Sequence, residues 1–186
     1  MADAMELRLG TMGKAREGPA VRPFRRGDIG PLVSIYRKAF REPPWNEDWK
    51  PEEVRKDLEF AISQAKPVIL VLERERRIRG FTWGYSLPME KFPFLEGAVE
   101  GNAIYMDEIA VDPRARRQGI GKALCMSFLI ASGLAGFEQA VLRTDQRNEA
   151  SMSLFGSVGF SNMGICDPEY PSRLYLRKRL EDAIRF

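Results

Sequence analysis

Residues 103–124, AIYMDEIAVDPRARRQGIGKAL, decide the fold of this chain. The first nine residues are rich in strand-forming side chains, and Asp112-Pro113 ends the expected strand because proline cannot donate to a ladder. A turn with three arginines follows, and Gly119 and Gly121 open an apolar segment that predicts a helix. A strand, a basic turn and a helix N-terminus are typical of an anion site, because free N–H groups and the helix dipole converge there.

Two common phosphate-binding motifs do not fit this turn. A Walker A loop needs serine or threonine after its Gly-Lys pair, but here the next residue is Ala123. The dinucleotide fingerprint needs a third glycine at position 124, where the chain has leucine. The motif that is present is Arg116-x-x-Gly119-x-Gly121. Its glycines allow a phosphate to approach the main chain without meeting a Cβ atom.

Composition indicates a globular domain without metal or disulfide support. Of 186 residues, 44% are hydrophobic and 30% are charged, which is enough to build a core. The net charge of +3 is too balanced to indicate a nucleic-acid partner, and the absence of histidine together with only two cysteines predicts no metal site. Residues 119–137 are apolar but contain a lysine and four glycines, which favours a buried helix over a membrane span. The N-terminus lacks a signal-peptide pattern, so we expect a cytoplasmic protein.

The rest of the chain alternates strands and helices. Residues 1–19 mix glycine and charge without periodicity and are expected to form a poorly ordered tail before a domain over 20–186. The strand–helix–strand unit around residues 118–135 predicts a parallel crossover of right-handed sense. The expected strands cover 20–25, 67–72, 78–87, 103–111, 139–145, 160–166 and 174–179, and the other helices follow the caps Asp28, Pro51 and Asn148.

A second motif lies about thirty residues after the first, near the expected last helix. It is Asn148-x-x-Ser151-x-x-Leu154-Phe155-x-x-x-Gly159-Phe160. Together the two motifs resemble those of the GNAT superfamily of N-acetyltransferases, which read Gln/Arg-x-x-Gly-x-Gly/Ala and Asn-x-x-Ala-x-x-Leu-Tyr-x-x-x-Gly-Phe. The order of expected elements over residues 20–180 also resembles that family.

This resemblance implies an α/β fold and a donor. The fold would have a central mixed, mostly antiparallel sheet with one parallel βαβ crossover and helices on both faces. Acetyl-CoA would be the acyl donor, and no metal would be required. Main-chain groups would hold the pantetheine arm, amides of the loop would hold the pyrophosphate, and Asn148 and Phe155 would lie along the arm. The residues implied for the first two roles are Ile109, Ala110, Val111, Arg116, Arg117, Gln118, Gly119, Ile120, Gly121 and Lys122.

The chain departs from the family pattern at Phe155. The family has a tyrosine there, often the acid that protonates the leaving thiolate, and a phenyl ring cannot donate a proton. Tyr170, Tyr105 and Cys166 are the candidates to replace it. Water or the acceptor itself are the alternatives.

Two adjacent acids are the candidates for a general base. An alkyl ammonium with a pKa near ~10 must lose a proton before it attacks, and a carboxylate can take that proton. Asp107 and Glu108 lie in the middle of a strand, where acids are disfavoured, so they need a reason to be there; pairing with nearby arginines is the alternative reason. Neighbours on a strand point to opposite faces, so we expect one of them to face the acceptor. We predict Glu108 as the base, with Asp107 as the second candidate.

The sequence therefore predicts an N-acetyltransferase that moves an acetyl group from acetyl-CoA directly to a primary amine of a small molecule or a protein. Trp45 and Trp49 are expected to form a wall or lid, and with the acids they favour a cationic acceptor that has an apolar body. The sequence leaves the oligomeric state open, with a homodimer as one alternative.

Two other classes of function remain alternatives at this point. Phe155 is compatible with a coenzyme A-binding regulatory module that does not turn over. A basic nucleic-acid-binding module is the weaker alternative, because aromatic residues do not alternate with its arginines. Those arginines are Arg114, Arg116, Arg117 and Arg143.

Overall fold

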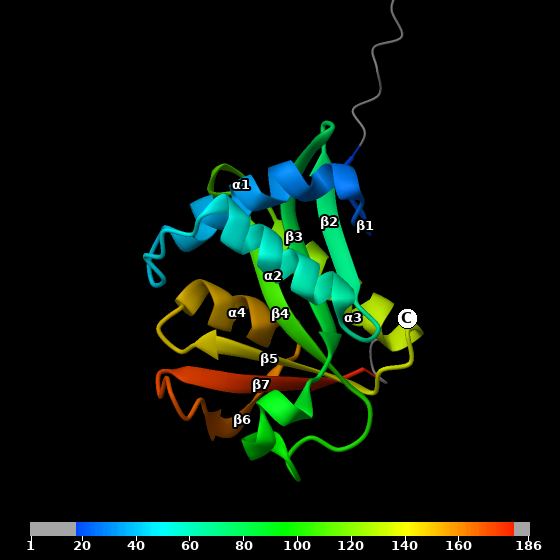
Figure 1. Ribbon diagram of the computed structural model, residues 1–186, viewed down its shortest axis with the longest axis vertical. Coiled ribbons are helices and arrows are strands. Elements are labelled where there is room, and N and C mark those ends of the chain that lie inside the picture. Colours follow the sequence, from blue (N-terminus) through cyan, green and yellow to red (C-terminus); the bar gives the residue numbers. More distant parts are fainter. Residues whose placement is uncertain (1–17, 181–186) are drawn as a thin grey trace, which may run out of the picture.

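The computed structural model describes residues 18–180, and its strands form one seven-stranded sheet in the order β1-β2-β3-β4-β5-β7-β6 (Figure 1). Every neighbouring pair is antiparallel except β4 and β5. This confirms the predicted mixed sheet with one parallel crossover. The strands are β1 (Ala20–Pro23), β2 (Val68–Arg74), β3 (Arg77–Ser86), β4 (Ala103–Val111), β5 (Gln139–Asp145), β6 (Ser161–Cys166) and β7 (Arg173–Arg179).

Helices cover both faces of the sheet, as the resemblance implied. The helices α1 and α2 lie across β3 and β4 on one face, and α3 lies against β2, β3 and β4 on the other (Figure 1). Predicted element ends differ from the observed ones by only one or two residues. The predicted tail over 1–19 lies almost wholly outside the described residues and stays a prediction. The helices are α1 (Ile29–Phe40), α2 (Pro51–Ser63), α3 (Ile120–Leu134) and α4 (Glu149–Ser157), with short 3-10 turns η1 (Arg26–Asp28), η2 (Met89–Lys91), η3 (Pro93–Leu95) and η4 (Pro113–Ala115).

The start of α1 corrects one expectation. Asp28 was expected to cap this helix, but its carboxylate is engaged in the turn before it. It accepts hydrogen bonds from the Arg22 side chain at 2.7 and 2.9 Å and from the Arg25 amide at 2.8 Å. The ion pair with Arg22 holds the pKa of Asp28 below its ordinary value. Asp28 therefore fastens β1 to the first turn, and a nearby arginine outcompetes the helix amides for it.

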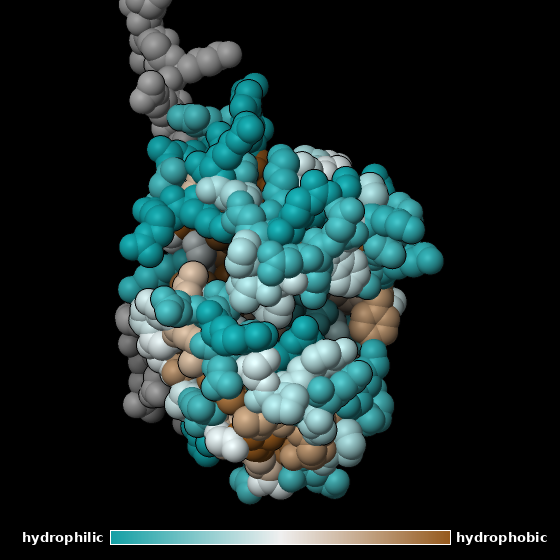
Figure 2. Space-filling view, turned by 90° about the vertical axis from the view of Figure 1, so that its left-hand side faces the viewer, coloured by the Kyte–Doolittle hydropathy of each residue, from teal (hydrophilic) through white to brown (hydrophobic). Residues whose placement is uncertain are grey.

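Each face of the sheet carries its own core. The α1–α2 face is aromatic, with Tyr36, Phe81 and Trp83 almost fully buried. The α3 face mixes aliphatic residues with phenylalanines, and Leu124 and Phe128 are fully buried there. Within the described residues, no helix reaches the length and apolarity that a bilayer crossing requires. Figure 2 shows one side of the molecule, where hydrophilic side chains cover most of the surface and hydrophobic ones gather toward the lower end.

The pairing of β3 with β4 contains a β-bulge. Trp83 pairs with Glu108 and Gly84 pairs with Met106, so Asp107 is an extra residue on β4. A bulge changes the direction of a side chain and increases the local twist. The expectation that Asp107 and Glu108 point to opposite faces assumed a regular strand, and the bulge removes that assumption.

Gly84, beside the bulge, is the site of the first prediction. A Cβ atom there would lie 2.3 Å from the Tyr105 carbonyl oxygen and 2.6 Å from a ring carbon of Phe128. Gly84→Ala is therefore expected to lower the free energy of unfolding by about 2–3 kcal/mol. Gly156→Ala is the control, because nothing lies within 4 Å of its added Cβ and the position is helical. That change should leave stability unchanged or raise it by up to about 1 kcal/mol in urea unfolding. Equal stabilities for the two variants would contradict the close approach.

Candidate active site

The site begins where β4 and β5 part. The two strands pair only from Ala103–Gln139 to Met106–Leu142. Beyond that point β4 continues with β3 to Val111, and β5 continues with β7 to Asp145. The edge of β4 that faces β5 is therefore unpaired, among the described strands, over residues 107–111. An unpaired strand edge can bind an extended chain that carries amides, and the pantetheine arm is such a chain. The predicted contacts of Ile109, Ala110 and Val111 with that arm are compatible with this edge.

The loop after β4 presents its main-chain amides outward. Arg117 and Gly119 both have left-handed backbone conformations, with φ of 62° and 78°. Within residues 18–180, none of the amides from Arg117 to Lys122 donates to a protein acceptor. A Cβ atom added to Gly119 would meet nothing within 4 Å. Consecutive free amides at a helix N-terminus form a nest that suits a phosphate group.

Side chains of this loop divide into two groups. Arg117 and Lys122 are exposed and can meet a pyrophosphate, whereas Ile120 is buried and can offer only its main chain. Arg116 forms an ion pair with Glu42 of the α1–α2 connection, and Gln118 accepts a 2.7 Å hydrogen bond from Arg74 on β2. The side chains of Arg116 and Gln118 thus hold the loop against its neighbours. Neither side chain is needed to contact a cofactor.

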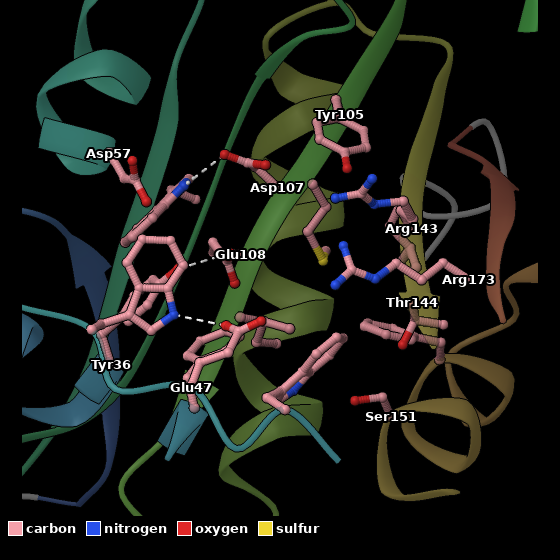
Figure 3. Close-up of a pocket in the computed structure, with 18 of the residues that line it drawn as sticks. Tyr36, Glu47, Asp57, Tyr105, Asp107, Glu108, Arg143, Thr144, Ser151 and Arg173 are labelled. Atoms are coloured by element: carbon pink, nitrogen blue, oxygen red, sulfur yellow. Dashed lines mark hydrogen bonds between the residues drawn. The ribbon is translucent and has the colours of Figure 1, made fainter. Parts of the chain in front are cut away.

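The bulge brings both predicted carboxylates into one cavity of about 480 Å³ (Figure 3). Asp107 Oδ2 accepts hydrogen bonds from the Trp83 indole and the Tyr85 hydroxyl, each at 3.1 Å. Glu108 Oε1 accepts one from the Tyr36 hydroxyl at 3.2 Å. The prediction that the two side chains point to opposite faces is therefore wrong. Neither forms an ion pair with a described residue, which removes the arginine-pairing explanation.

Burial sets the protonation of these acids. Loss of solvent raises the pKa of Glu108 well above its ordinary value, and the neighbouring Asp107 raises it further. Burial also raises the pKa of Asp107, although the hydrogen bonds from Trp83 and Tyr85 oppose the rise. The pKa of Asp57, on α2, is raised by burial and by Asp107. Groups of this kind can exchange protons nearer neutral pH than ordinary carboxyls can.

The other walls of the cavity are mainly aromatic. The connection between α1 and α2 contributes Trp45, Glu47 and Trp49, and the Trp49 indole donates to Glu47 at 2.7 Å. This places both tryptophans in the wall, as the sequence indicated. Aromatic faces and carboxylates together favour a cation. The remaining aromatic lining residues are Tyr36, Phe40, Phe60, Trp83, Tyr85, Tyr105, Phe155 and Tyr170.

The last helix and the β6–β7 connection close the far side. Phe155 lines the cavity and is 4% exposed, and Tyr170 lines it while remaining 44% exposed. Asn148 instead caps α4, accepting a 3.1 Å hydrogen bond from the Ser151 amide, so its contact with the cofactor stays a prediction. Cys166, a candidate acid, does not contribute to the lining.

Several lining residues were not identified from the sequence. Tyr36 and Asp57 lie on amphipathic helices, where their spacing looks like that of any core or surface position. Trp83 and Tyr85 alternate along β3, which is a signal for one shared face. Arg173 opens β7 and carried no signal of its own.

The fold and the open edge of β4 are those expected of an acyltransferase. The profile of the Acetyltransferase (GNAT) family matches residues 32–160. The chain therefore belongs to the GNAT acetyltransferase family. This membership confirms the predicted family and the fold that it implied.

Individual relatives agree with this assignment. The mycothiol acetyltransferase of Salinispora arenicola is 28% identical over 152 residues, which are 78% of this chain and 45% of that protein. The chain thus spans about half the length of the curated relatives it matches. An N-acetyltransferase structure from Staphylococcus aureus Mu50 has a TM-score of 0.69 at 21% identity, covering 88% of this chain and 99% of that one. The structure of yncA from Salmonella typhimurium with its cofactor acetyl-CoA has a TM-score of 0.68 at 16% identity, covering 88% and 95%.

The phosphate nest can be tested with a matched pair of glycines. Gly119→Val would place a branched side chain in the space above the loop and is expected to weaken coenzyme A binding by about 30-fold. That loss equals about 2 kcal/mol, the scale of losing one or two charge-assisted hydrogen bonds. Gly136→Val is the control, because Gly136 also has a positive φ, 86°, and open space at its Cβ, but lies after the other end of α3. Calorimetric titration should show native affinity for the control. Native affinity in a folded Gly119→Val protein would contradict the nest.

Proposed function

We propose that the protein transfers the acetyl group of acetyl-CoA directly to the primary amine of a small cationic molecule with an apolar body. The observation that carries this proposal is the pair of half-buried carboxylates, Asp107 and Glu108, in an aromatic cavity at the point where β4 and β5 part. The cavity volume of about 480 Å³ suits a small molecule. Acetyl-CoA supplies the acetyl group as an activated thioester.

Each group of residues has a separate role in the proposed reaction. The amides from Arg117 to Lys122 hold the pyrophosphate, and the unpaired edge of β4 over 109–111 orients the arm toward the cavity. The aromatic wall excludes water and surrounds the acceptor. Glu108 removes a proton from the ammonium so that the nitrogen lone pair becomes available. Holding both reactants side by side in one cavity supplies the proximity that the reaction needs.

Glu108 suits the role of base better than Asp107. Two hydrogen bonds to Asp107 Oδ2 fix that carboxylate and stabilise its charge, whereas Glu108 accepts a side-chain hydrogen bond from only one described residue, Tyr36. Burial and the neighbouring charge both raise the pKa of Glu108. A base accepts protons most effectively when its pKa lies close to the working pH.

Phe155 does not prevent this reaction. An alkyl ammonium gives up two protons in becoming an amide, and one of them can neutralise the leaving thiolate. The proton balance therefore closes without a tyrosine at position 155. Tyr170 and Tyr105 line the cavity and remain candidates to relay that proton.

The acid-lined acceptor cavity favours an enzyme over the regulatory module that was the alternative. A module that only bound coenzyme A would have no use for two buried carboxylates beside the cofactor cleft. The cytoplasmic location remains part of the proposal, and a homodimer remains one alternative for the assembly. Light scattering and cell fractionation would test them.

Replacing the proposed base gives the next prediction. Glu108→Gln should lower kcat for an alkyl amine by about 10²–10⁴-fold, because the side chain can no longer accept a proton. Activity of the native enzyme should rise with pH through the raised pKa of Glu108, and the variant should regain part of its deficit at high pH, where free amine is abundant. Coenzyme A affinity should be unchanged. The measurement is a pair of pH–rate profiles, with Asp107→Asn as the companion variant.

Thermal stability separates catalysis from structure in the same variant. The pKa of Glu108 is higher in the folded chain than its ordinary value, so the folded state binds that proton more tightly. Stability is therefore lost as pH rises from the ordinary value through the raised one. Neutral glutamine avoids this loss, and the melting temperature of Glu108→Gln at neutral pH should equal or exceed the native one. A stable variant with an unaltered pH–rate profile would remove Glu108 from the mechanism.

A further inference from the structure

The wall opposite the carboxylates contains two arginines. Arg143 comes from β5 and Arg173 from the start of β7, and both point toward the cavity (Figure 3). The antiparallel register pairs Arg143 with Tyr175 and Asp145 with Arg173, so these four side chains share one face of the sheet. The cavity therefore has an acidic wall and a basic wall.

The nearby acids are already engaged by other partners. Asp167 accepts hydrogen bonds from Arg143 at 2.6 Å and from the Tyr175 hydroxyl at 3.1 Å. Asp145, the cross-strand partner of Arg173, is 3% exposed and turns instead to Arg147 and Ser172. These hydrogen bonds hold the pKa of Asp145 below its ordinary range.

Arg173 is left without an ionic partner among the residues the structure describes. Its guanidinium instead lies 4.3 Å from the ring centroid of Tyr170 and 5.5 Å from that of Trp45. Aromatic rings attract the faces of a guanidinium and leave the N–H donors in its plane unused. The side chain is thus held in place with its donors available, although it is only half-buried.

We propose that Arg173 binds a carboxylate of the acceptor, so that the substrate is a zwitterion whose amine lies beside Glu108. This deepens the proposed function and rests on it. The planar guanidinium fork matches a carboxylate in two parallel hydrogen bonds. A doubly charged phosphate would instead meet the repulsion of four carboxyl groups that line the same cavity, Glu47, Asp57, Asp107 and Glu108.

The proposed role of Arg173 also predicts that a polyamine is a poor acceptor. A diamine would place its second cation beside Arg173, whose charge has no acidic partner among the described residues and repels it. An amino acid places its two charges on the two walls of opposite sign. The acceptor class that fits both walls is therefore an amine joined to a carboxylate by a short apolar spacer.

The test compares acceptors that differ only in the charge of one end. A series of straight-chain ω-amino acids, from glycine upward, is assayed beside the matching carboxamides and diamines. In the native protein, the best amino acid should exceed its carboxamide in kcat/KM by at least about tenfold, a difference typical of a charge-assisted pair. Arg173→Gln should remove that preference, mainly by raising KM for the amino acid. Arg173→Lys should keep part of it.

A matched arginine provides the control. Arg177 lies on the same strand, but its guanidinium donates to the Ala98 carbonyl at 2.9 Å and does not line the cavity. Arg177→Gln should leave the preference for the carboxylate intact. Calorimetric binding of the best amino acid in the presence of coenzyme A should show the same loss in Arg173→Gln without relying on turnover.

The outcomes separate this inference from the proposed function. Acetylation of amines and carboxamides with no gain from the carboxylate, or with a gain that survives Arg173→Gln, would overturn the role of Arg173 and leave the acetyltransferase intact. A preference for diamines would overturn it in favour of a polyamine. Failure to acetylate or bind any member of the panel would overturn both the small-amine acceptor and the carboxylate subsite.

Discussion

The parting of β4 from β5 is the constraint on which the rest of the site depends. It opens the sheet without interrupting it, because β4 stays paired with β3 and β5 stays paired with β7. Figure 1 shows the result, with β5 and β7 crossing the lower half of the molecule at a steep angle to β2, β3 and β4. One continuous stretch of chain then supplies the carboxylates, the unpaired edge and the phosphate nest. In the proposed reaction, this strand and the loop that follows it would therefore contact both the donor and the acceptor.

Placing two adjacent acids in an aromatic core has an electrostatic cost, and their hydrogen-bond donors reduce it. The donors are an indole and two phenols, which hold the acids without neutralising them. Burial raises the pKa of Tyr36, and Glu108 raises it further; burial and Asp107 do the same for Tyr85. Both phenols thus keep their protons over the whole working range of pH. The acids are the members of this cluster whose protonation can change near neutral pH, which is the behaviour required of a base.

The sequence predicted local features well and non-local ones poorly. The loop after β4 joins a strand, a turn and a helix start that are contiguous in the chain, so Gly119 and its neighbours could be identified from the sequence as a candidate phosphate site. The bulge depends on how β3 and β4 align, and the sequence of β4 does not contain that register. Asp107 and Glu108 were therefore identified as candidates while their directions were predicted wrongly. Arg173 is a candidate binding residue because no described acid pairs with it. That observation depends on where Asp145 and Asp167 lie, which the sequence does not show. Asp28 was misassigned for a related reason, since Arg22 reaches it from β1.

Tyr36 belongs to the core and to the site at once. Its ring stacks on Phe40 at 4.3 Å and lies 5.9 Å from Trp83, while its hydroxyl holds Glu108. A substitution that repacks the aromatic residues around Tyr36 also moves its ring, and it therefore changes the pKa of Glu108. Such substitutions are therefore not neutral during evolution, whereas most substitutions that repack a core are tolerated. The range of acceptors open to descendants of this chain is consequently bounded by the packing of α1 against the sheet, and new specificities are more accessible through the two connections that form the cavity walls.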